Sequence, residues 1–289
     1  MAGSGTTRTY RERHLSAQDG LQLYYRDYGD PLSPGIPLLC LTGLTRNSQD
    51  YADLAERFAG SRRVICPDYR GRGRSAHDPN WRNYDPMIYL GDIGHILMAN
   101  DIHRVIIVGT SLGGLLAMGL AVMRPTNVAA VVINDIGPDV DPGGLARIIE
   151  FIGIDRPQPD WPSAVAMLRR ALPRLAIKND HWWERFARAT YHEGADGALH
   201  FDWDIALVEP LKRSNGEIQD LWPFFRALRN IPTLLVRGEI SDVLTTDGLR
   251  RMIADKPDLI AVTVPGIGHT PSLDEPEIRD VLDDFIARF

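Results

Sequence analysis

The sequence predicts an α/β protein built on a mostly parallel sheet with helices on both sides. Two observations predict this class: short apolar runs recur along the 289 residues, and most are separated by longer segments of helical periodicity. Continuous apolar runs are typical of strands that are covered on both faces, and their alternation with helices is typical of parallel sheets. A composition of 44% hydrophobic and 24% charged residues is that of a folded globular protein with a sizeable core.

The expected elements follow from these two periodicities. Seven apolar runs are expected to be strands, at positions 21–27, 38–41, 64–67, 105–108, 128–133, 233–236 and 260–264. Five amphipathic or apolar segments between and after them are expected to be helices, at positions 51–58, 86–99, 112–123, 246–253 and 277–289.

The alternation stops between about positions 139 and 222. No convincing strand occurs there, proline and glycine interrupt helical patches, and five of the six tryptophans of the chain fall in this region, at positions 161, 182, 183, 203 and 222. We therefore expect a core domain made of residues 1–139 and 223–289. Residues 140–222 are expected to form a helical cap, inserted between two strands of the same sheet.

Composition excludes several classes of function. Lysine and arginine number 32 against 38 acidic residues, a net charge of −6, so no basic surplus exists to bind nucleic acid. No apolar run is long enough to span a bilayer, and the first twenty residues have no signal-peptide core, so we expect a cytoplasmic protein without membrane contact. The two cysteines, Cys40 and Cys66, lie in expected strands and read as buried thiols.

Common metal-binding and cofactor-binding patterns are absent from the sequence. The sequence has no H-E-x-x-H, no C-x-x-C and no phosphate-binding glycine loop followed by lysine. We therefore expect no metal, no cofactor, and a small-molecule substrate as the partner.

A serine stands in Gly-Thr-Ser-Leu-Gly, at positions 109–113, directly after an expected strand and before an expected helix. The pattern G-x-S-x-G in this setting is the nucleophile elbow, a sharp turn that holds serine in a strained backbone conformation. Gly109 and Gly113 lack side chains, as the close passage of the helix over the strand requires. We therefore expect Ser111 to be a nucleophile at the positive end of the helix, where anionic intermediates are favoured.

A serine nucleophile needs a base, and His269 is the histidine placed to serve. It follows the last expected strand on the glycine-rich segment Val-Pro-Gly-Ile-Gly-His, at positions 264–269. The base in turn needs a carboxylate to hold its tautomer and stabilise the imidazolium. Two aspartates leave strand ends and fit the chain order Ser, Asp, His: Asp242, which we prefer, and Asp135, which remains the alternative acid.

Attack on a carbonyl group also needs preorganised donors for the developing oxyanion. One is expected to be the backbone N–H of Leu112, the residue after the nucleophile. The other is expected to be the N–H of Leu44, in the turn Leu-Thr-Gly-Leu-Thr-Arg at positions 41–46, where Gly43 lets the backbone turn.

With these residues in place the chain resembles the α/β-hydrolase fold family over nearly its whole length. The segment Asp-Tyr-Arg-Gly-Arg-Gly-Arg-Ser, at 68–75, resembles the family's D-x-R-G-x-G-x-S loop, and Asp-Gly-Leu-Gln-Leu-Tyr-Tyr, at 19–25, resembles its opening strands. The resemblance implies an eight-stranded, mostly parallel sheet, with the cap inserted after the sixth strand. It also matches Asp242 and His269 to the family's acid and base. One departure is Thr42, where the family usually has histidine before the glycine of the oxyanion turn.

Serine at the elbow separates the chain from members of this family that carry aspartate there, the haloalkane dehalogenases and epoxide hydrolases. We expect a serine hydrolase that cleaves small to medium, largely apolar carboxylic esters through an acyl-enzyme, with the cap covering the pocket. Two alternatives stay open: a C–C bond hydrolase acting on products of aromatic ring cleavage with the same triad, and a ligand receptor on the same fold.

Overall fold

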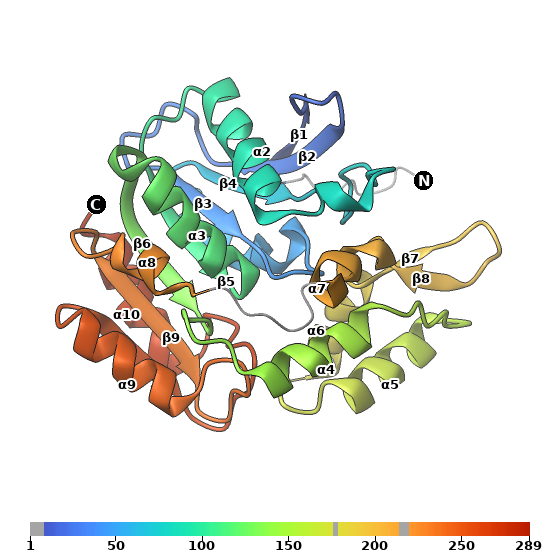
Figure 1. Cartoon of the computed structure of the whole chain (residues 1–289). Helices are drawn as coiled ribbons and strands as arrows, with labels where there is room; N and C mark the ends of the chain where they lie inside the picture. The colour runs from blue at the N-terminus through green and yellow to red at the C-terminus, as the bar shows by residue number, and fades with distance from the viewer. Residues whose placement is uncertain (1–8, 176–178, 214–219) are drawn as a thin grey trace.

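Eight strands form a single sheet in the computed structural model, which describes residues 9–175, 179–213 and 220–289 (Figure 1). Their order across the sheet is β1-β2-β4-β3-β5-β6-β9-β10. The bounds are β1 Tyr10–Ser16, β2 Gln22–Tyr28, β3 Leu38–Leu41, β4 Val64–Asp68, β5 Val105–Thr110, β6 Val128–Asn134, β9 Thr233–Gly238 and β10 Ile260–Val264.

The sheet is mostly parallel, as the sequence predicts. Only β2 runs against its two neighbours, β1 and β4, and every pairing from β4 to β10 is parallel. Strand β1 was not expected, because its sequence, Tyr-Arg-Glu-Arg-His-Leu-Ser, is polar and half-exposed rather than an apolar run. Charged side chains of this kind are typical of an edge strand, which they protect from pairing with other chains.

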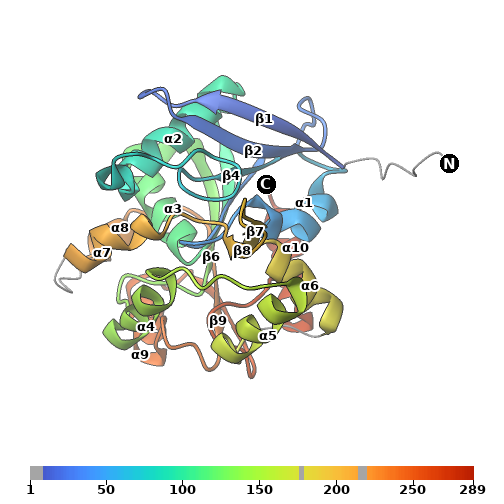
Figure 2. The same ribbon diagram turned by 90° about the vertical axis from the view of Figure 1, so that its right-hand side faces the viewer.

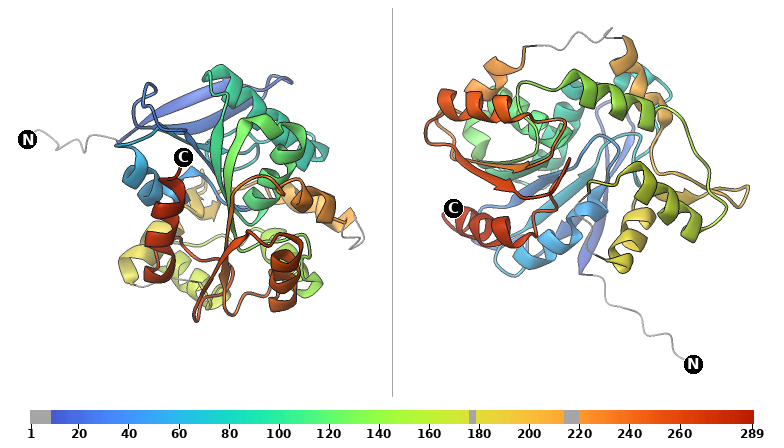
Figure 3. Two further views of the ribbon diagram at one scale, coloured as in Figure 1. Left: turned by 90° about the vertical axis from the view of Figure 1, so that its left-hand side faces the viewer. Right: turned by 90° about the horizontal axis from the view of Figure 1, so that it is seen from below.

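Helices cover both faces of the sheet because successive strand residues point to opposite sides. In β3, Leu38 and Cys40 pack on one face with α1 and α10, while Leu39 and Leu41 pack on the other. Figures 2 and 3 show α1 and α10 on one side of the sheet and α2 and α3 on the other. The bounds of these and the two further core helices are α1 Ala52–Phe58, α2 Pro86–Ala99, α3 Leu112–Met123, α8 Trp222–Arg226, α9 Thr246–Asp255 and α10 Pro276–Ile286.

The segment from α4 to α7, which we call the cap, holds three main helices that lie together at one end of the molecule (Figure 1). It also contains a β-hairpin, β7 and β8, so the prediction that this region has no strand was wrong. Each hairpin strand has three residues, too few to show an alternating pattern in the sequence. The cap elements are α4 Pro142–Ile152, α5 Trp161–Ala171, α6 Asp180–Arg188, β7 Tyr191–Glu193, β8 Leu199–Phe201 and α7 Glu209–Arg213.

Aromatic side chains hold the hairpin to the rest of the cap. The rings of Phe201 and Trp203 stack with centroids 4.0 Å apart, and Phe151 of α4 packs against both. The division into a core domain and a cap domain at the predicted boundaries stays a prediction. Four short 3₁₀ helices complete the described elements: Ser48–Tyr51, Trp81–Asn83, Pro125–Asn127 and Ile205–Val208. Within the described residues, no helix has the length and apolar character needed to cross a membrane.

Candidate active site

Ser111 lies alone between the end of β5 and the first residue of α3. Its backbone angles, φ 52° and ψ −117°, fall where residues with a side chain are rarely found, which is a mark of stored strain at functional sites. Glycine is required on both sides: a Cβ on Gly109 would overlap the backbone of Gly113, and one on Gly113 would overlap the carbonyl oxygen of Leu41. The sharp strand-to-helix turn that the sequence predicts is therefore present.

His269 reaches Ser111 from the loop after β10. Its Nε2 lies 3.0 Å from Ser111 Oγ, which is hydrogen-bond distance, and only 12% of its side chain is exposed. The loop is held from the cap as well, because the backbone N–H of Gly268 donates to the carbonyl of Arg174 at 2.9 Å. The nucleophile and base predicted from sequence are thus brought together.

Asp135 is the carboxylate that the structure pairs with His269. It directly follows β6, is completely buried, and places Oδ2 2.8 Å from His269 Nδ1. The same carboxylate accepts hydrogen bonds from the N–H of Gly238 at 2.9 Å and the hydroxyl of Ser241 at 2.7 Å. A carboxylate at Nδ1 favours the tautomer protonated there, so Nε2 is left free to accept the serine proton.

Asp242, the acid preferred from sequence, does not contact His269. Its carboxylate pairs with Arg147 of α4, with Nη2 at 2.7 Å from Oδ1 and 2.6 Å from Oδ2, and 31% of its side chain is exposed. The preference for Asp242 is therefore corrected in favour of Asp135. Asp242 lies four residues beyond the end of β9, after a turn that points its side chain toward the cap instead of the histidine.

The turn after β3, residues 42–46, lies beside the nucleophile, and we call it the oxyanion turn. A Cβ placed on Gly43 would be 3.8 Å from the Cβ of Ser111, so the turn lies next to the elbow. The carbonyl of Gly43 accepts a hydrogen bond from the N–H of Arg46 at 3.1 Å. Because a trans peptide directs its N–H opposite to its C=O, the N–H of Leu44 points away from that bond.

Leu112 supplies a second backbone N–H at the same place. It is the first residue of α3, and the first N–H groups of a helix have no partner within the helix. Both expected oxyanion donors therefore belong to segments that lie next to Ser111.

Two polar residues that sequence reasoning missed support the loops of the site. Asn134 accepts the N–H of Ser111 through its carbonyl at 2.9 Å and donates from its side chain to the carbonyl of Pro271, at 2.9 Å. Tyr51 places its hydroxyl 2.7 Å from Thr110 Oγ1, and burial raises the pKa of this tyrosine well above its ordinary value, so it stays neutral. A polar residue closing an apolar strand, as Asn134 does, is the signal that could have identified the first.

Titratable groups in the described part of the chain do not gather into a metal site. No cluster of three or more histidine, cysteine, aspartate or glutamate side chains there has the geometry to hold an ion. The arrangement that the residues do form is a hydroxyl, an imidazole and a buried carboxylate in one line of hydrogen bonds, beside the turn that carries Leu44 and the helix start that carries Leu112. Such an arrangement can activate a hydroxyl for attack on a carbonyl carbon and hold the oxyanion that results.

Comparison with known proteins bears on the whole chain. The sequence profile of the alpha/beta hydrolase family matches residues 38–278. A 3-hydroxybutyrate-oligomer hydrolase of Cupriavidus necator is 31% identical over 265 residues, 88% of this chain and 89% of that protein. A 2-(acetamidomethylene)succinate hydrolase of Mesorhizobium japonicum is 27% identical over 84% of this chain and 85% of its own.

A solved structure agrees with these sequence matches. The crystal structure of an alpha/beta hydrolase from Novosphingobium aromaticivorans is 40% identical and superimposes with a TM-score of 0.91, covering 98% of this chain and 100% of that one. Fold, profile and relatives point the same way. The chain belongs to the alpha/beta hydrolase family and is a hydrolase.

Proposed function

We propose that this protein is a serine hydrolase that cleaves small to medium, largely apolar carboxylic esters through an acyl-enzyme. The observation that carries the proposal is the continuous chain from Ser111 Oγ to His269 Nε2, at 3.0 Å, and from His269 Nδ1 to Asp135 Oδ2, at 2.8 Å. Within this series of hydrogen bonds, Ser111 is the nucleophile, His269 is the general base and acid, and Asp135 is the group that orients the imidazole.

The reaction follows from these roles in two halves. Ser111 Oγ forms a bond to the ester carbonyl carbon while its proton passes to His269 Nε2, and Asp135 stabilises the imidazolium. The N–H groups of Leu44 and Leu112 hold the oxyanion. The intermediate collapses by breaking the bond to the alkoxy oxygen, which takes the proton from His269. Water, deprotonated by His269, then attacks the acyl carbon. The bond from that carbon to Ser111 Oγ breaks, Oγ takes the proton back from His269, and the acid is released.

Support for a substrate class comes from the relative named as a 3-hydroxybutyrate-oligomer hydrolase, which aligns with 88% of this chain. In such oligomers each unit is a short acyl group esterified to a secondary alcohol, which fits the class of small, largely apolar esters. We therefore place short oligoesters of 3-hydroxybutyrate first among the substrates to be tested.

A second candidate is a substrate with two carboxylates or an enolisable group. The relative named as a 2-(acetamidomethylene)succinate hydrolase favours it, because that compound is an unsaturated dicarboxylate. A C–C bond hydrolase of ring-cleavage products belongs to the same set and would use the same hydroxyl, imidazole and carboxylate. The receptor alternative loses its ground, since the chain is a hydrolase.

The test is a substrate panel with Ser111→Ala as the comparison variant. We expect wild type to hydrolyse p-nitrophenyl butyrate or a 3-hydroxybutyrate dimer, and Ser111→Ala to lose roughly 10⁵–10⁶-fold in kcat, since removal of a catalytic serine costs about that much. A fluorophosphonate should label wild type on the peptide carrying Ser111 and leave Ser111→Ala unlabelled. Undiminished turnover by Ser111→Ala contradicts the proposal, and preference for a dienone acid or the dicarboxylate over every ester selects the second candidate.

A further inference from the structure

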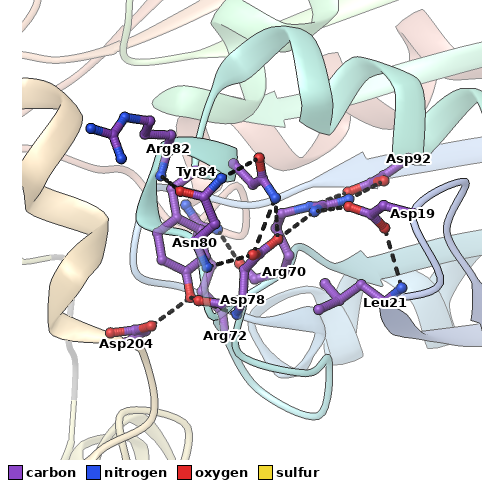
Figure 4. A network of polar contacts seen from close by, with 11 residues as sticks. Asp19, Leu21, Arg70, Arg72, Asp78, Asn80, Arg82, Tyr84, Asp92 and Asp204 are labelled. Atoms are coloured by element: carbon purple, nitrogen blue, oxygen red, sulfur yellow. Dashed lines mark hydrogen bonds and ion pairs between the residues drawn. The ribbon is translucent and has the colours of Figure 1, made fainter.

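The loop after β4, residues 69–75, contains two arginines with no access to solvent and contrasting partners. Arg70 is 1% exposed and contacts three carboxylates: Asp92 through two bonds of 2.8 Å, Asp78 at 2.6 Å and Asp19 at 2.7 Å. Figure 4 shows Arg70 between these three aspartates. Because its charge is paired with carboxylates, Arg70 is an ordinary buried cation. It connects the loop to α2 and to the turn that precedes β2.

Arg72, two residues later, is 0% exposed and forms no ion pair in the described part of the chain. Its donors reach neutral oxygens on three segments: Nε donates to the carbonyl of Leu44, Nη1 to the carbonyl of Arg70 at 2.7 Å, and Nη2 to the hydroxyl of Tyr89 at 3.2 Å. Its guanidinium also lies 4.8 Å from the ring centre of Tyr89. A buried charge without a counter-ion is energetically unfavourable. Where proteins contain unfavourable features of this kind, they are concentrated at functional sites.

Arg72 bears on the reaction because its Nε donates to the carbonyl of Leu44, and Leu44 belongs to the oxyanion turn. Three consecutive carbonyls of that turn are held by hydrogen bonds. Tyr69 donates its hydroxyl to Thr42 O at 3.2 Å, the N–H of Arg46 donates to Gly43 O at 3.1 Å, and Arg72 holds Leu44 O. With the peptide groups before, at and after the Gly43–Leu44 bond all fixed, the direction of the Leu44 N–H is fixed as well.

The backbone of Arg72 is in turn held by the cap. Arg72 and Trp203 form an antiparallel bridge, in which Gly73 N–H donates to Asp202 O at 3.0 Å and Asp204 N–H donates to Gly71 O at 2.8 Å. The cap segment that follows β8 therefore continues, through one arginine side chain, to the turn beside Ser111. Tyr84 adds a side-chain link from the core to Asp204 of this segment, as Figure 4 shows.

From these contacts we propose that Arg72 is a positioning residue for the reaction: it connects the cap to the oxyanion turn and keeps the Leu44 N–H aimed at the oxyanion. The inference rests on the proposed function, in which Leu44 is an oxyanion donor. The side chain of Arg72 donates to Leu44, Arg70 and Tyr89, so it acts on the reaction through the turn that it holds. Its effect is to keep the donor in place, so that no reorganisation is needed as charge develops on the carbonyl oxygen.

The sharpest test uses the same substitution at both arginines, Arg72→Lys and Arg70→Lys. Lysine keeps the charge but has a methylene where arginine has Nε, so Arg72→Lys removes the bond to Leu44 while the cation remains. We expect kcat on p-nitrophenyl butyrate to fall about 10- to 100-fold in Arg72→Lys, with KM changed less than about 3-fold, because loosening an oxyanion donor costs less than the 10²–10³ of deleting one. Arg70→Lys, which alters a loop anchor only, is expected to stay within about 3-fold of wild type in both constants.

A tetrahedral inhibitor distinguishes a misplaced oxyanion donor from a general loss of rigidity in the fold. An alkyl boronic acid forms a tetrahedral adduct with serine and fills the oxyanion site, so its Ki should rise in Arg72→Lys by the factor by which kcat/KM falls. Tyr69→Phe, which deletes only the hydroxyl that donates to Thr42 O, should lower kcat and raise Ki by about 3- to 10-fold. This variant decides the question if Arg72→Lys does not fold.

The outcomes distinguish the inference from the function on which it rests. If Arg72→Lys, or Tyr69→Phe in its place, matches Arg70→Lys in kcat and in boronate Ki, Arg72 is a structural residue and the inference is overturned. If wild type turns over no ester, the rate at which fluorophosphonate labels Ser111 gives the same comparison between the variants. Turnover that survives Ser111→Ala, in contrast, defeats the proposed function itself, whatever the arginine variants do.

Discussion

The loops that follow β6 and β9 each carry an aspartate, and the two side chains have opposite surroundings. Asp135, after β6, is completely buried and accepts three hydrogen bonds, one of them from His269. Asp242, after β9, is partly exposed and pairs with Arg147 of the cap. The comparison shows that chain order and proximity to a strand end do not identify the aspartate that pairs with His269, since both aspartates satisfy these two criteria.

Backbone geometry makes the choice. Asp135 is the first residue after β6 and has a φ of 58°, and its carboxylate accepts a hydrogen bond from Gly238, the last residue of β9. Asp242 stands beyond a turn that begins at Gly238, where the N–H of Ser241 donates to the carbonyl of Gly238 at 3.0 Å. The residue of the β9 loop that faces the site is Ser241, one position earlier, which donates to Asp135.

The largest expected effect separates the two aspartates directly. Asp135→Asn should lower kcat on an ester substrate about 10⁴-fold, because the amide leaves His269 in the wrong tautomer without changing the shape of the site. Asp242→Asn should change kcat less than about 3-fold. Steady-state kinetics of both variants, with circular dichroism to verify folding, measures the difference. A larger loss in Asp242→Asn would return the acid's role to the loop after β9.

The sequence allowed the sheet and the elbow to be predicted well because their signals are local. The expected helices at 86–99 and 112–123 coincide with α2 and α3, and Gly109 and Gly113 are dictated by contacts within one strand–turn–helix unit. The choice between Asp135 and Asp242 depends on how two loops far apart in sequence pack together. No residue type or spacing in either loop encodes that packing.

Two elements escaped prediction for a related reason. Strand β1 is polar and recognisable only by its pairing with β2, and the strands of the β7–β8 hairpin are too short to show a period. The burial of Arg72 could not be predicted from the sequence either, because it too depends on tertiary packing. Its place in an arginine-rich segment gives the appearance of a solvated charge, whereas the tertiary structure buries it completely.

Ser241→Ala tests how far the β9 loop contributes to the site through Asp135. The hydroxyl donates to Asp135 Oδ2 at 2.7 Å, the same oxygen that contacts His269. Its removal should lower kcat about 3- to 10-fold, since a hydrogen bond to a charged group contributes about 1.5–3 kcal/mol and water can replace part of it. Kinetics of Ser241→Ala beside Asp242→Asn provides the measurement. Equal behaviour of the two neighbours would mean that the loop acts only as packing.

A third aspartate extends the comparison into the cap. Burial, and secondarily the nearby charge of Asp68, raise the pKa of Asp202 to about 7, while a hydrogen bond from Asn47 at 2.8 Å opposes the shift. Because the folded state holds this proton more tightly than the unfolded chain, the stability that Asp202 contributes is complete below about pH 4. It decreases as pH rises toward 7 and is lost above that value.

Asp202→Asn removes this dependence, because an amide does not ionise and its oxygen can still accept from Asn47. The melting temperature of the variant, relative to wild type, should therefore rise between pH 5 and pH 8 by roughly 5–10 degrees, the shift that about 2–3 kcal/mol produces. Thermal unfolding followed by circular dichroism at the two values checks the sign. A relative melting temperature that stays constant over this range would show that Asp202 is ionised in the folded protein throughout.

The smallest expected effect concerns the ion pair of Arg147 with Asp242, the aspartate that the sequence had assigned to His269. Arg147 and Asp242 join α4 of the cap to the β9 loop, but the side chains are 49% and 31% exposed, and exposed pairs contribute about 0.2–1 kcal/mol. A double-mutant cycle with Arg147→Met and Asp242→Asn should give a coupling free energy of unfolding within that range, and kcat should change little. A backbone bond from Asp141 N–H to Val243 O, at 3.2 Å, holds the same junction and survives both substitutions. A coupling well above about 1 kcal/mol, accompanied by loss of activity, would mean that cap docking at Asp242 controls the site, so the two aspartates would differ in how they serve the reaction instead of in whether they do.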